Sequence, residues 1–204
     1  TGVLAQVVYY FSSAISLGAP GRPVSFTVPT GNFGDIFAGY IAKRMGLPID
    51  QLVVATNQND ILHRCLSTGK YEKDEVLPSL SPSMDIQISS NFERALFEAY
   101  DRDGSAVSRV MEELSQKGRF LLSQGVSKKL GQYFSSNSAS EEETLATIQK
   151  SFAQTGELLC PHSAIGVNVA EKVRVPETPM ITLATAHPSK LSLIHISEPT
   201  RRRG

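Results

Sequence analysis

The feature that most constrains the fold is a short apolar run that ends in a glycine-containing loop just before a helical pattern. Val24–Val28 is rich in β-branched residues, and it leads into GNFGD, residues 31–35. Apolar residues then recur at helical spacing from Ile36 to Met45, and Leu52–Ala55 forms a second apolar run. Continuous apolar strands separated by a helix predict an α/β fold, in which helices cover both faces of a parallel sheet.

The rest of the chain predicts more helices and one more strand. Gly18 and Pro20 end a first helix, whose expected core face is made of Leu4, Val7, Val8, Phe11 and Ile15. Residues 61–156 are predicted to be mostly a helical excursion. The expected helices of this excursion are Phe92–Tyr100, Val107–Lys117 and Glu141–Gln154. After Pro161 we expect a further helix, Ser163–Val173, and then a last strand, Met180–Ala184.

Residues 135–143, SSNSASEEE, are the best candidate for a linker. Ser140 followed by Glu143 also fits a capping box, in which each of the two side chains binds the other residue's backbone amide. We therefore interpret this stretch as a loop that ends in a helix N-cap.

Composition excludes several classes of function. The 204 residues, 41% of them hydrophobic, suit one large domain or two small ones. Basic and acidic residues number 20 each, so no overall charge favours nucleic acid as a partner. Two distant cysteines and no signal peptide indicate a reducing compartment, the cytoplasm, and no apolar run is long enough to span a membrane.

The loop at residues 31–35 predicts a phosphate site. A loop between a strand and a helix N-terminus presents free backbone N–H groups and the positive end of the helix dipole. Gly31 and Gly34 allow close approach, and Asn32 tolerates unusual backbone angles. The spacing fits neither of the common nucleotide-binding glycine motifs. The alternative is a tight turn whose glycines serve only packing.

Several blocks in order carry a resemblance to one family: PTGNFGDIFAGYIAKRMGLPI, VVATNQNDIL, SPSMDIQISSNFERALFEAY, CPHSAIGV and LATAHPSK. Together they resemble threonine synthase, a pyridoxal-phosphate enzyme of fold type II, over roughly residues 4–190. The resemblance implies that residues 1–190 are part of the large cofactor-binding domain. It also implies that the full-length enzyme converts O-phospho-L-homoserine and water to L-threonine and phosphate.

The resemblance also assigns cofactor-binding residues. Gly31, Asn32, Phe33, Gly34 and Asp35 match the loop that holds the cofactor phosphate in the family. Thr185 matches the threonine that approaches the pyridine nitrogen. No residue is assigned to a metal, because Cys160 and His162, which flank Pro161, lack the spacing and the partners of a zinc site.

No lysine of this chain lies in the context of the family's Schiff-base lysine, which belongs to an upstream segment resembling Phe-Lys-Asp. Lys43, Lys70 and Lys190 have different neighbours. We therefore expect the 204-residue chain alone to have no threonine-forming activity. Two rival functions are another fold type II pyridoxal-phosphate lyase or replacement enzyme, and a noncatalytic phosphate-binding module.

Polar residues near the predicted strand ends are candidates for substrate contact. They are Asn57, Asn59, Asp60 and Arg64, after the second strand, and His187, near Thr185. The alternative for the first four is an Asn turn and an N-cap, with Arg64 solvated or paired. His187 alternatively bonds only backbone. His162 is expected at a helix start or in the wall of the active site.

Residues Ser83 to Asp85 also match the family, but a structural role is favoured. Pro82 and Ser83 predict a turn and cap, whereas Met84 and Ile86 are expected in the core.

Residues 191–204, LSLIHISEPTRRRG, depart from the family pattern. They resemble the conceptual translation of a sequencing-library adapter, so we expect a non-native tail and exclude it from the fold. The sequence indicates no oligomeric state. Truncating a parallel sheet exposes an edge and apolar surface, so poor solubility is expected.

Overall fold

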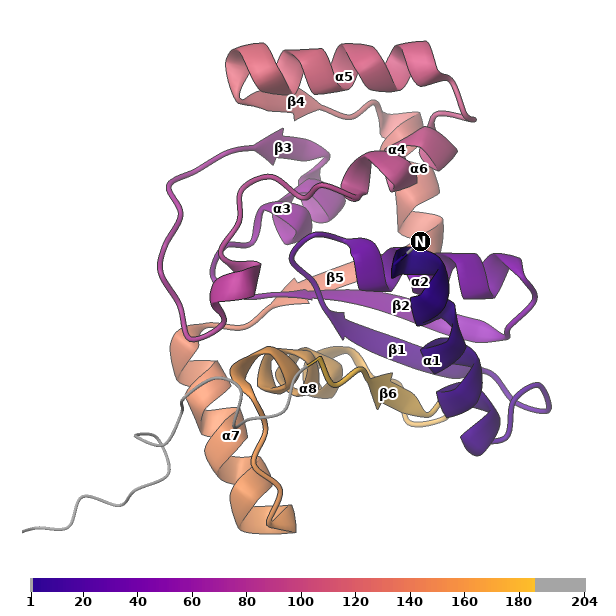
Figure 1. The fold of residues 1–204 in the computed structure, drawn as a ribbon, viewed down its shortest axis with the longest axis vertical. Helices are drawn as coiled ribbons and strands as arrows, with labels where there is room; N and C mark the ends of the chain where they lie inside the picture. The colour runs from indigo at the N-terminus through magenta and orange to yellow at the C-terminus, as the bar shows by residue number, and fades with distance from the viewer. Residues whose placement is uncertain (1, 186–204) are drawn as a thin grey trace, which may run out of the picture.

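The computed structural model describes residues 2–185. Helices and strands alternate along most of this length, and Figure 1 shows them coloured from the N-terminus to the C-terminus. In chain order the elements are α1 (Gly2–Ser16), β1 (Val24–Pro29), α2 (Gly34–Arg44), β2 (Ile49–Thr56), α3 (Ile61–Thr68), β3 (Lys70–Glu72), the 3₁₀ turn η1 (Pro82–Met84), α4 (Phe92–Ala99), α5 (Gly104–Lys117), β4 (Arg119–Leu121), α6 (Gln124–Tyr133), β5 (Ser135–Ser138), α7 (Glu141–Thr155), α8 (Pro161–Val173) and β6 (Met180–Thr182).

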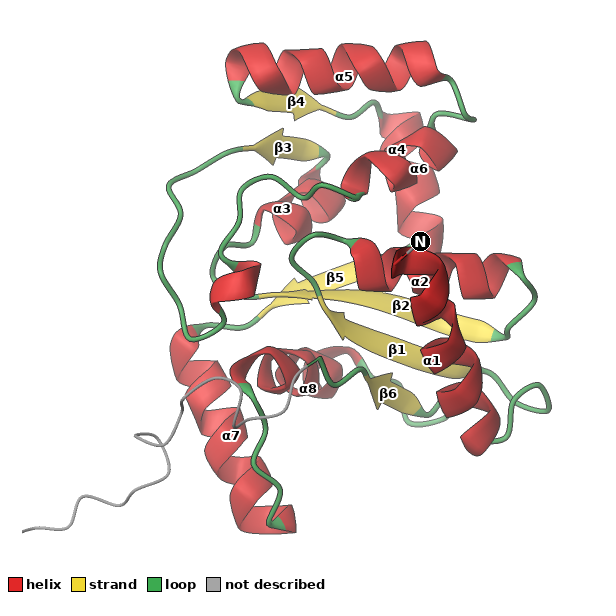
Figure 2. Ribbon diagram, viewed as in Figure 1, coloured by secondary structure: helices red, strands yellow, loops and turns green. Residues whose placement is uncertain are grey.

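A four-stranded parallel sheet with the order β5-β2-β1-β6 forms the centre of the fold (Figure 2). Both predicted apolar runs are its inner strands: Phe26 pairs with Leu52, and Pro29 pairs with Ala55. β6 joins the other edge of β1, with Thr27 opposite Thr182. The predicted α/β class with a parallel sheet is therefore confirmed.

The two faces of the sheet carry separate parts of the core. Alternate residues of β2 belong to different clusters: Leu52 and Val54 pack with side chains of α1 and α2, whereas Val53 and Ala55 pack with α8. Figure 1 shows α8 on the opposite side of the sheet from α2. Because both faces are covered, the inner strands need apolar residues in succession instead of alternation.

The predicted core face of α1 is wrong in part. Val7 is buried and Phe11 packs half-buried on the core, as predicted, whereas Leu4, Val8 and Ile15 are exposed. Tyr10 and Ala14, which were not predicted, are buried. Tyr10 sets the rotation of the helix, because its ring lies 4.7 Å from that of Phe26 and its hydroxyl donates to the Asp35 carbonyl at 2.7 Å. Apolar residues occur around most of this helix, so periodicity did not single out the face that packs.

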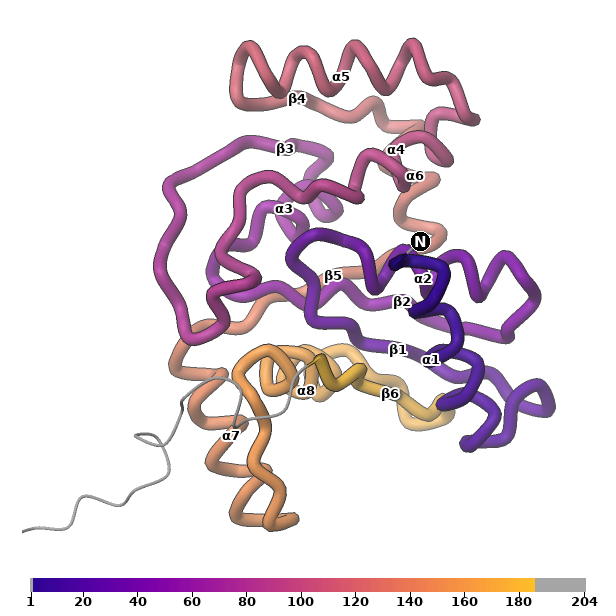
Figure 3. Tube along the Cα trace, in the orientation of Figure 1, coloured from indigo at the N-terminus to yellow at the C-terminus, as the bar shows by residue number. Residues whose placement is uncertain are grey.

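The excursion between β2 and α7 contains the expected helices and also two short strands. β3 and β4 pair antiparallel, with Tyr71 opposite Phe120, at the far end of the molecule from the central sheet (Figure 2). Three residues give no recognisable alternation, so sequence reasoning missed both strands. Between β3 and α4 the chain runs as a long loop that returns through η1 (Figure 3).

The candidate linker is not a loop: Ser135–Ser138 forms β5, an outer strand of the sheet. Its register places Ser135 beside Val53 and Ser138 beside Thr56. The capping box that follows is confirmed, because the Ser140 hydroxyl accepts from the Glu143 amide at 3.2 Å and the Glu143 carboxylate accepts from the Ser140 amide at 2.9 Å.

Candidate functional site

The carboxyl ends of the central strands define the candidate site. Because the strands are parallel, the segments that follow β1, β2 and β6 leave the same edge of the sheet (Figure 1). The amide of Thr30 donates to the Ala55 carbonyl at 2.8 Å, and the amide of Leu183 donates to the Thr27 carbonyl at 3.0 Å. Ligands of open α/β sheets bind at such an edge.

The loop after β1 is held by a buried aromatic ring. Phe33 has φ 67°, in the left-handed region, and directly precedes α2. Its ring is buried against those of Phe92 and Phe134, with centroids 5.1 and 5.2 Å away. The Phe33 side chain therefore serves the core, and only its backbone is available to a ligand.

The first carbonyls of this loop bond to the protein, while the amides of its first three residues stay free. The Gly31 carbonyl accepts from the Ser89 hydroxyl at 2.8 Å, and the Asn32 carbonyl accepts from the Asn91 amide at 3.0 Å. The Asn32 side chain accepts from the Gly34 amide at 2.9 Å. Within residues 2–185, the backbone amides of Gly31, Asn32 and Phe33 form no hydrogen bond.

This arrangement fits an anion such as phosphate. Free amides at the N-terminus of the 11-residue α2 lie at the positive end of its dipole. The hydroxyl of Thr56, at the end of β2, is also buried without a hydrogen-bond partner among the described residues. Asp35 is the loop's one carboxyl group, and burial raises its pKa.

Gly31 is needed because η1 lies directly on it. A Cβ at this position would stand 2.8 Å from the carbonyl oxygen of Ser83 and 3.3 Å from the Cα of Met84. These are backbone atoms, so a side chain here would displace the turn. Met84 is buried as predicted, whereas Ile86, expected in the core, is only half-buried.

The comparisons with known proteins agree on one family. Residues 163–192 match the family model described as "Threonine synthase, C-terminal". Threonine synthase of Pseudomonas aeruginosa is 52% identical over 189 residues, which is 92% of this chain and 40% of that protein. This chain belongs to the threonine synthase family.

Solved structures of threonine synthases share its fold. The structure described as PLP-bound threonine synthase from Brucella melitensis has a TM-score of 0.91 and 58% identity, over 93% of this chain and 41% of that one. Yeast threonine synthase has a TM-score of 0.88 and 41% identity, over the same shares. The chain thus spans about two fifths of the length of these relatives. The chain shares their fold, fold type II.

Asn57 and Asn59 lie together at the end of β2, where both are buried. The Asn57 side-chain amide donates to Asp85 Oδ1 at 2.7 Å, and that of Asn59 donates to the same oxygen at 3.0 Å. Asp85 also accepts from the amide and hydroxyl of Ser79, at 2.8 and 2.5 Å. The two asparagines therefore anchor the loop that ends in η1.

Asp60 and Arg64 form an ion pair on α3. Asp60 occupies the N-cap position, but its side chain makes no capping bond, so the cap in the alternative interpretation is wrong, whereas its Asn turn is present at Asn57. Its carboxylate instead accepts from Arg64 Nε at 2.8 Å, and Arg64 also contacts Asp74 at 2.9 Å. The guanidinium is thus paired, and both Asp60 and Arg64 side chains are about 30% exposed.

His162 and Cys160 stand at the start of α8, as the sequence predicts for His162. His162 is 6% exposed, and its Nε2 lies 2.5 Å from the Ser83 hydroxyl of η1. Cys160 caps the helix by accepting from the Ser163 amide at 3.4 Å. The link between His162 and η1 was not predicted, because no sequence pattern relates residues 79 positions apart.

Thr185 is exposed beyond the end of β6, the strand that pairs with β1. Its contact with a cofactor ring stays a prediction. His187, Lys190 and residues 191–204 lie outside the described part of the chain. Among the described residues there is no cluster of three or more His, Cys, Asp or Glu that suits a metal ion. No helix within residues 2–185 has the length and hydrophobicity to cross a membrane.

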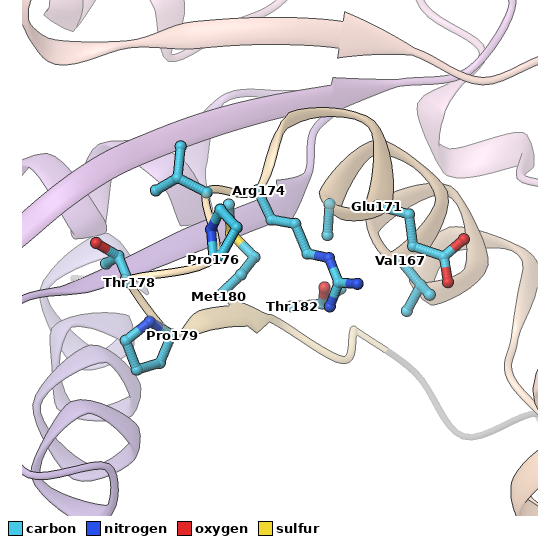
Figure 4. Close-up of a pocket in the computed structure, with 10 residues that line it drawn as sticks. Val167, Glu171, Arg174, Pro176, Thr178, Pro179, Met180 and Thr182 are labelled. Carbon is cyan, nitrogen blue, oxygen red and sulfur yellow. The ribbon is translucent and has the colours of Figure 1, made fainter.

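A pocket of about 570 Å³ lies apart from the loop, between the C-terminal half of α8 and β6. Figure 4 shows Arg174, Glu171 and Thr182 around it. The Glu171 carboxylate already pairs with Lys150 at 2.8 Å. This pocket includes none of the predicted site residues.

Proposed function

We propose that residues 31–35 hold the phosphate of pyridoxal phosphate. The observation that carries this proposal is the set of free amides at Gly31, Asn32 and Phe33, at the N-terminus of α2 and beside a backbone contact that only glycine allows. The Brucella melitensis relative, described as PLP-bound, supports the same cofactor.

The side chains around the loop have complementary roles. Asn32 holds the Gly34 amide in an Asx turn, and Phe33 fixes the left-handed step through its buried ring. Thr185 would offer a neutral hydroxyl to the pyridine nitrogen, as the family resemblance implies. Pyridoxal phosphate supplies an electron sink that stabilises carbanions next to the substrate's amino group.

The proposed reaction of the protein that carries this chain is that of the family: O-phospho-L-homoserine and water give L-threonine and phosphate. Among the substrate candidates, Arg64 is the cation, so it is the residue we propose for the anionic ends of the substrate. Asp60 and Asp74 would hold its guanidinium in place. Asn57 and Asn59 would support the substrate site by anchoring the loop that ends in η1. His187, in the segment after β6, would contact the substrate. A cytoplasmic location follows from the same assignment.

We further propose that the 204-residue chain binds the cofactor without turnover. Lys70 pairs with Glu72, and Lys43, in the last turn of α2, donates to the Asp50 carbonyl, so both lysines are engaged elsewhere. A lysine that attacks the cofactor must be desolvated or otherwise activated.

Calorimetric titration of the purified chain tests the phosphate cradle. We expect pyridoxal phosphate to bind, whereas pyridoxal, which lacks the phosphate, binds at least about tenfold more weakly because charged hydrogen bonds to the amides are lost. Gly31→Ala should weaken binding similarly. Gly125→Ala is the matched control, since a Cβ there meets nothing within 4 Å. Equal affinity for both ligands would contradict the proposal.

Product analysis separates the family reaction from its rivals. The full-length protein, supplied with pyridoxal phosphate and O-phospho-L-homoserine, should release threonine and phosphate in equal amounts. Another replacement or lyase reaction would give a different amino acid or a keto acid. Threonine formation by the 204-residue chain alone would refute the expectation of no turnover.

A further inference from the structure

We propose that His162 is a positioning residue for the phosphate loop: through Ser83 it holds η1 against Gly31. This inference rests on the proposed function, because the ligand of the loop is the phosphate assigned above. It adds a residue from α8, which lies on the opposite face of the sheet from α2, to a site otherwise built from β1, α2 and η1.

The first step is the rigidity of the platform that carries His162. Helix α8 packs tightly on the sheet, because a Cβ at Gly166 would stand 2.6 Å from Thr182 Cγ2 and 3.1 Å from Pro29 Cγ. Pro29 is the last residue of β1, immediately before the loop. The position of His162 is therefore fixed relative to the strand that delivers the loop.

The second step is the contact between His162 and η1. His162 Nε2 lies 2.5 Å from the Ser83 hydroxyl, and the ring is 6% exposed. His162 is the one side-chain partner of that hydroxyl among the described residues. The residues on either side of the turn are held differently, through Ser81 and Asp85, which bind Asn57. The middle of η1 therefore depends on His162.

The third step leads from Ser83 to the loop. The Ser83 carbonyl oxygen is the atom closest to a Cβ built on Gly31, at 2.8 Å. Any shift of η1 toward or away from the sheet therefore changes the space around Gly31. The other side of the loop is held by Ser89 and Asn91, so η1 completes its enclosure.

The other ring nitrogen of His162 makes no competing contact. Nδ1 of His162 is buried and forms no hydrogen bond with any described residue. Burial acts to raise the pKa of the Cys160 thiol, but the neighbouring His162 and Ser163 outweigh it and lower the pKa to about 6. The one polar contact of the His162 ring among the described residues is therefore the one that Nε2 makes with the Ser83 hydroxyl.

The test measures binding of inorganic phosphate and of pyridoxal phosphate to the chain by calorimetry. Ser83→Ala and His162→Phe should each weaken the binding of both ligands about tenfold. His162→Gln, which keeps a polar group able to reach Ser83, should restore affinity to within about threefold of the unsubstituted chain. His63→Phe is the matched control, because His63 contacts Ser136 on β5 instead of η1.

Urea unfolding of each variant separates positioning from folding. Ser83 is exposed, so Ser83→Ala should unfold at nearly the same urea concentration as the unsubstituted chain. The affinity of Ser83→Ala therefore tests the positioning role even if His162→Phe does not fold. Unchanged phosphate affinity in folded Ser83→Ala would overturn the inference and leave the proposed function standing. Failure of the unsubstituted chain to bind either ligand would overturn the proposed function, and this inference with it.

Discussion

At the scale of single residues, the loop at residues 31–35 depends on one buried side chain and on one position without a side chain. Phe33 accepts a left-handed backbone angle that is unusual for a bulky residue, and the burial of its ring offsets the strain. Gly31 leaves room for η1. The sequence predicted this loop as a ligand site, but it did not reveal that the Phe33 ring belongs to the core, because both partners, Phe92 and Phe134, lie far along the chain.

Phe33→Ala should therefore destabilise the protein strongly. Removing a fully buried ring costs about 3 kcal/mol or more, since the partners cannot fill the space. The free energy of unfolding in urea measures the loss. Phe152→Ala is the control, because Phe152 is 52% exposed, and its cost should stay below about 1 kcal/mol. Equal costs for the two substitutions would mean that the Phe33 ring does not anchor the loop.

Cys160 should make stability depend on pH near neutrality. Its folded pKa is about 6, against 9.0 for an unperturbed thiol, so between these values the unfolded chain binds one more proton than the folded one. The free energy of unfolding should therefore rise as pH increases from about 6 to 9, and this contribution is lost as pH falls through 6.

Cys160→Ser, which keeps a capping oxygen, should reduce that rise in urea titrations at stepped pH. Cys65 does not interfere in this range, because burial raises its pKa to about 12 and its contribution lowers stability only above about 9. Parallel pH curves for the unsubstituted chain and Cys160→Ser would contradict the assignment.

At the scale of elements, what could be predicted depended on where each element finds its partners. The inner strands and the capping box of α7 carry their signals locally, as apolar runs or as a fixed spacing. β5 carries none: its serines and asparagine pair with β2 through backbone groups at the edge of the sheet. The face of α1 was likewise decided by Tyr10, whose partners Phe26 and Asp35 lie in other elements.

The capping box of α7 predicts that its removal lowers the free energy of unfolding. Ser140→Ala removes the acceptor for the Glu143 amide at the start of α7, and the free energy of unfolding should fall by about 1 kcal/mol. Ser108→Ala, on the exposed side of α5, should change it by less than about 0.5 kcal/mol. If Ser140→Ala proves as mild as Ser108→Ala in urea unfolding, the box is not contributing to stability.

At the scale of the whole molecule, one helix surface stands out as apolar and exposed. Leu4, Val8 and Ile15 of α1 are each at least 60% exposed, although they follow the helical spacing of a core face. Patches of this kind promote association. Poor solubility of the isolated chain thus remains a prediction, now with a defined surface as its cause.

Replacing this surface should improve solubility without loss of stability. Leu4→Glu with Val8→Lys adds an i,i+4 ion pair on the exposed side of α1, so we expect less association in light scattering at the same protein concentration. Val7→Lys, at a buried position of the same helix, should instead lower the unfolding midpoint. Unchanged association of the double variant would mean that another surface of the chain causes the association.

The pairing of β6 with β1 also bears on how the chain is made. Thr27 and Thr182, whose hydroxyls lie 3.1 Å apart, are separated by 155 residues, so one flank of β1 waits for all of that length to be translated before its neighbour leaves the ribosome. β1, β2 and the helices between and before them are available much earlier and pair within a short stretch of chain. Until β6 emerges, that early unit presents an open strand to the cell's chaperones.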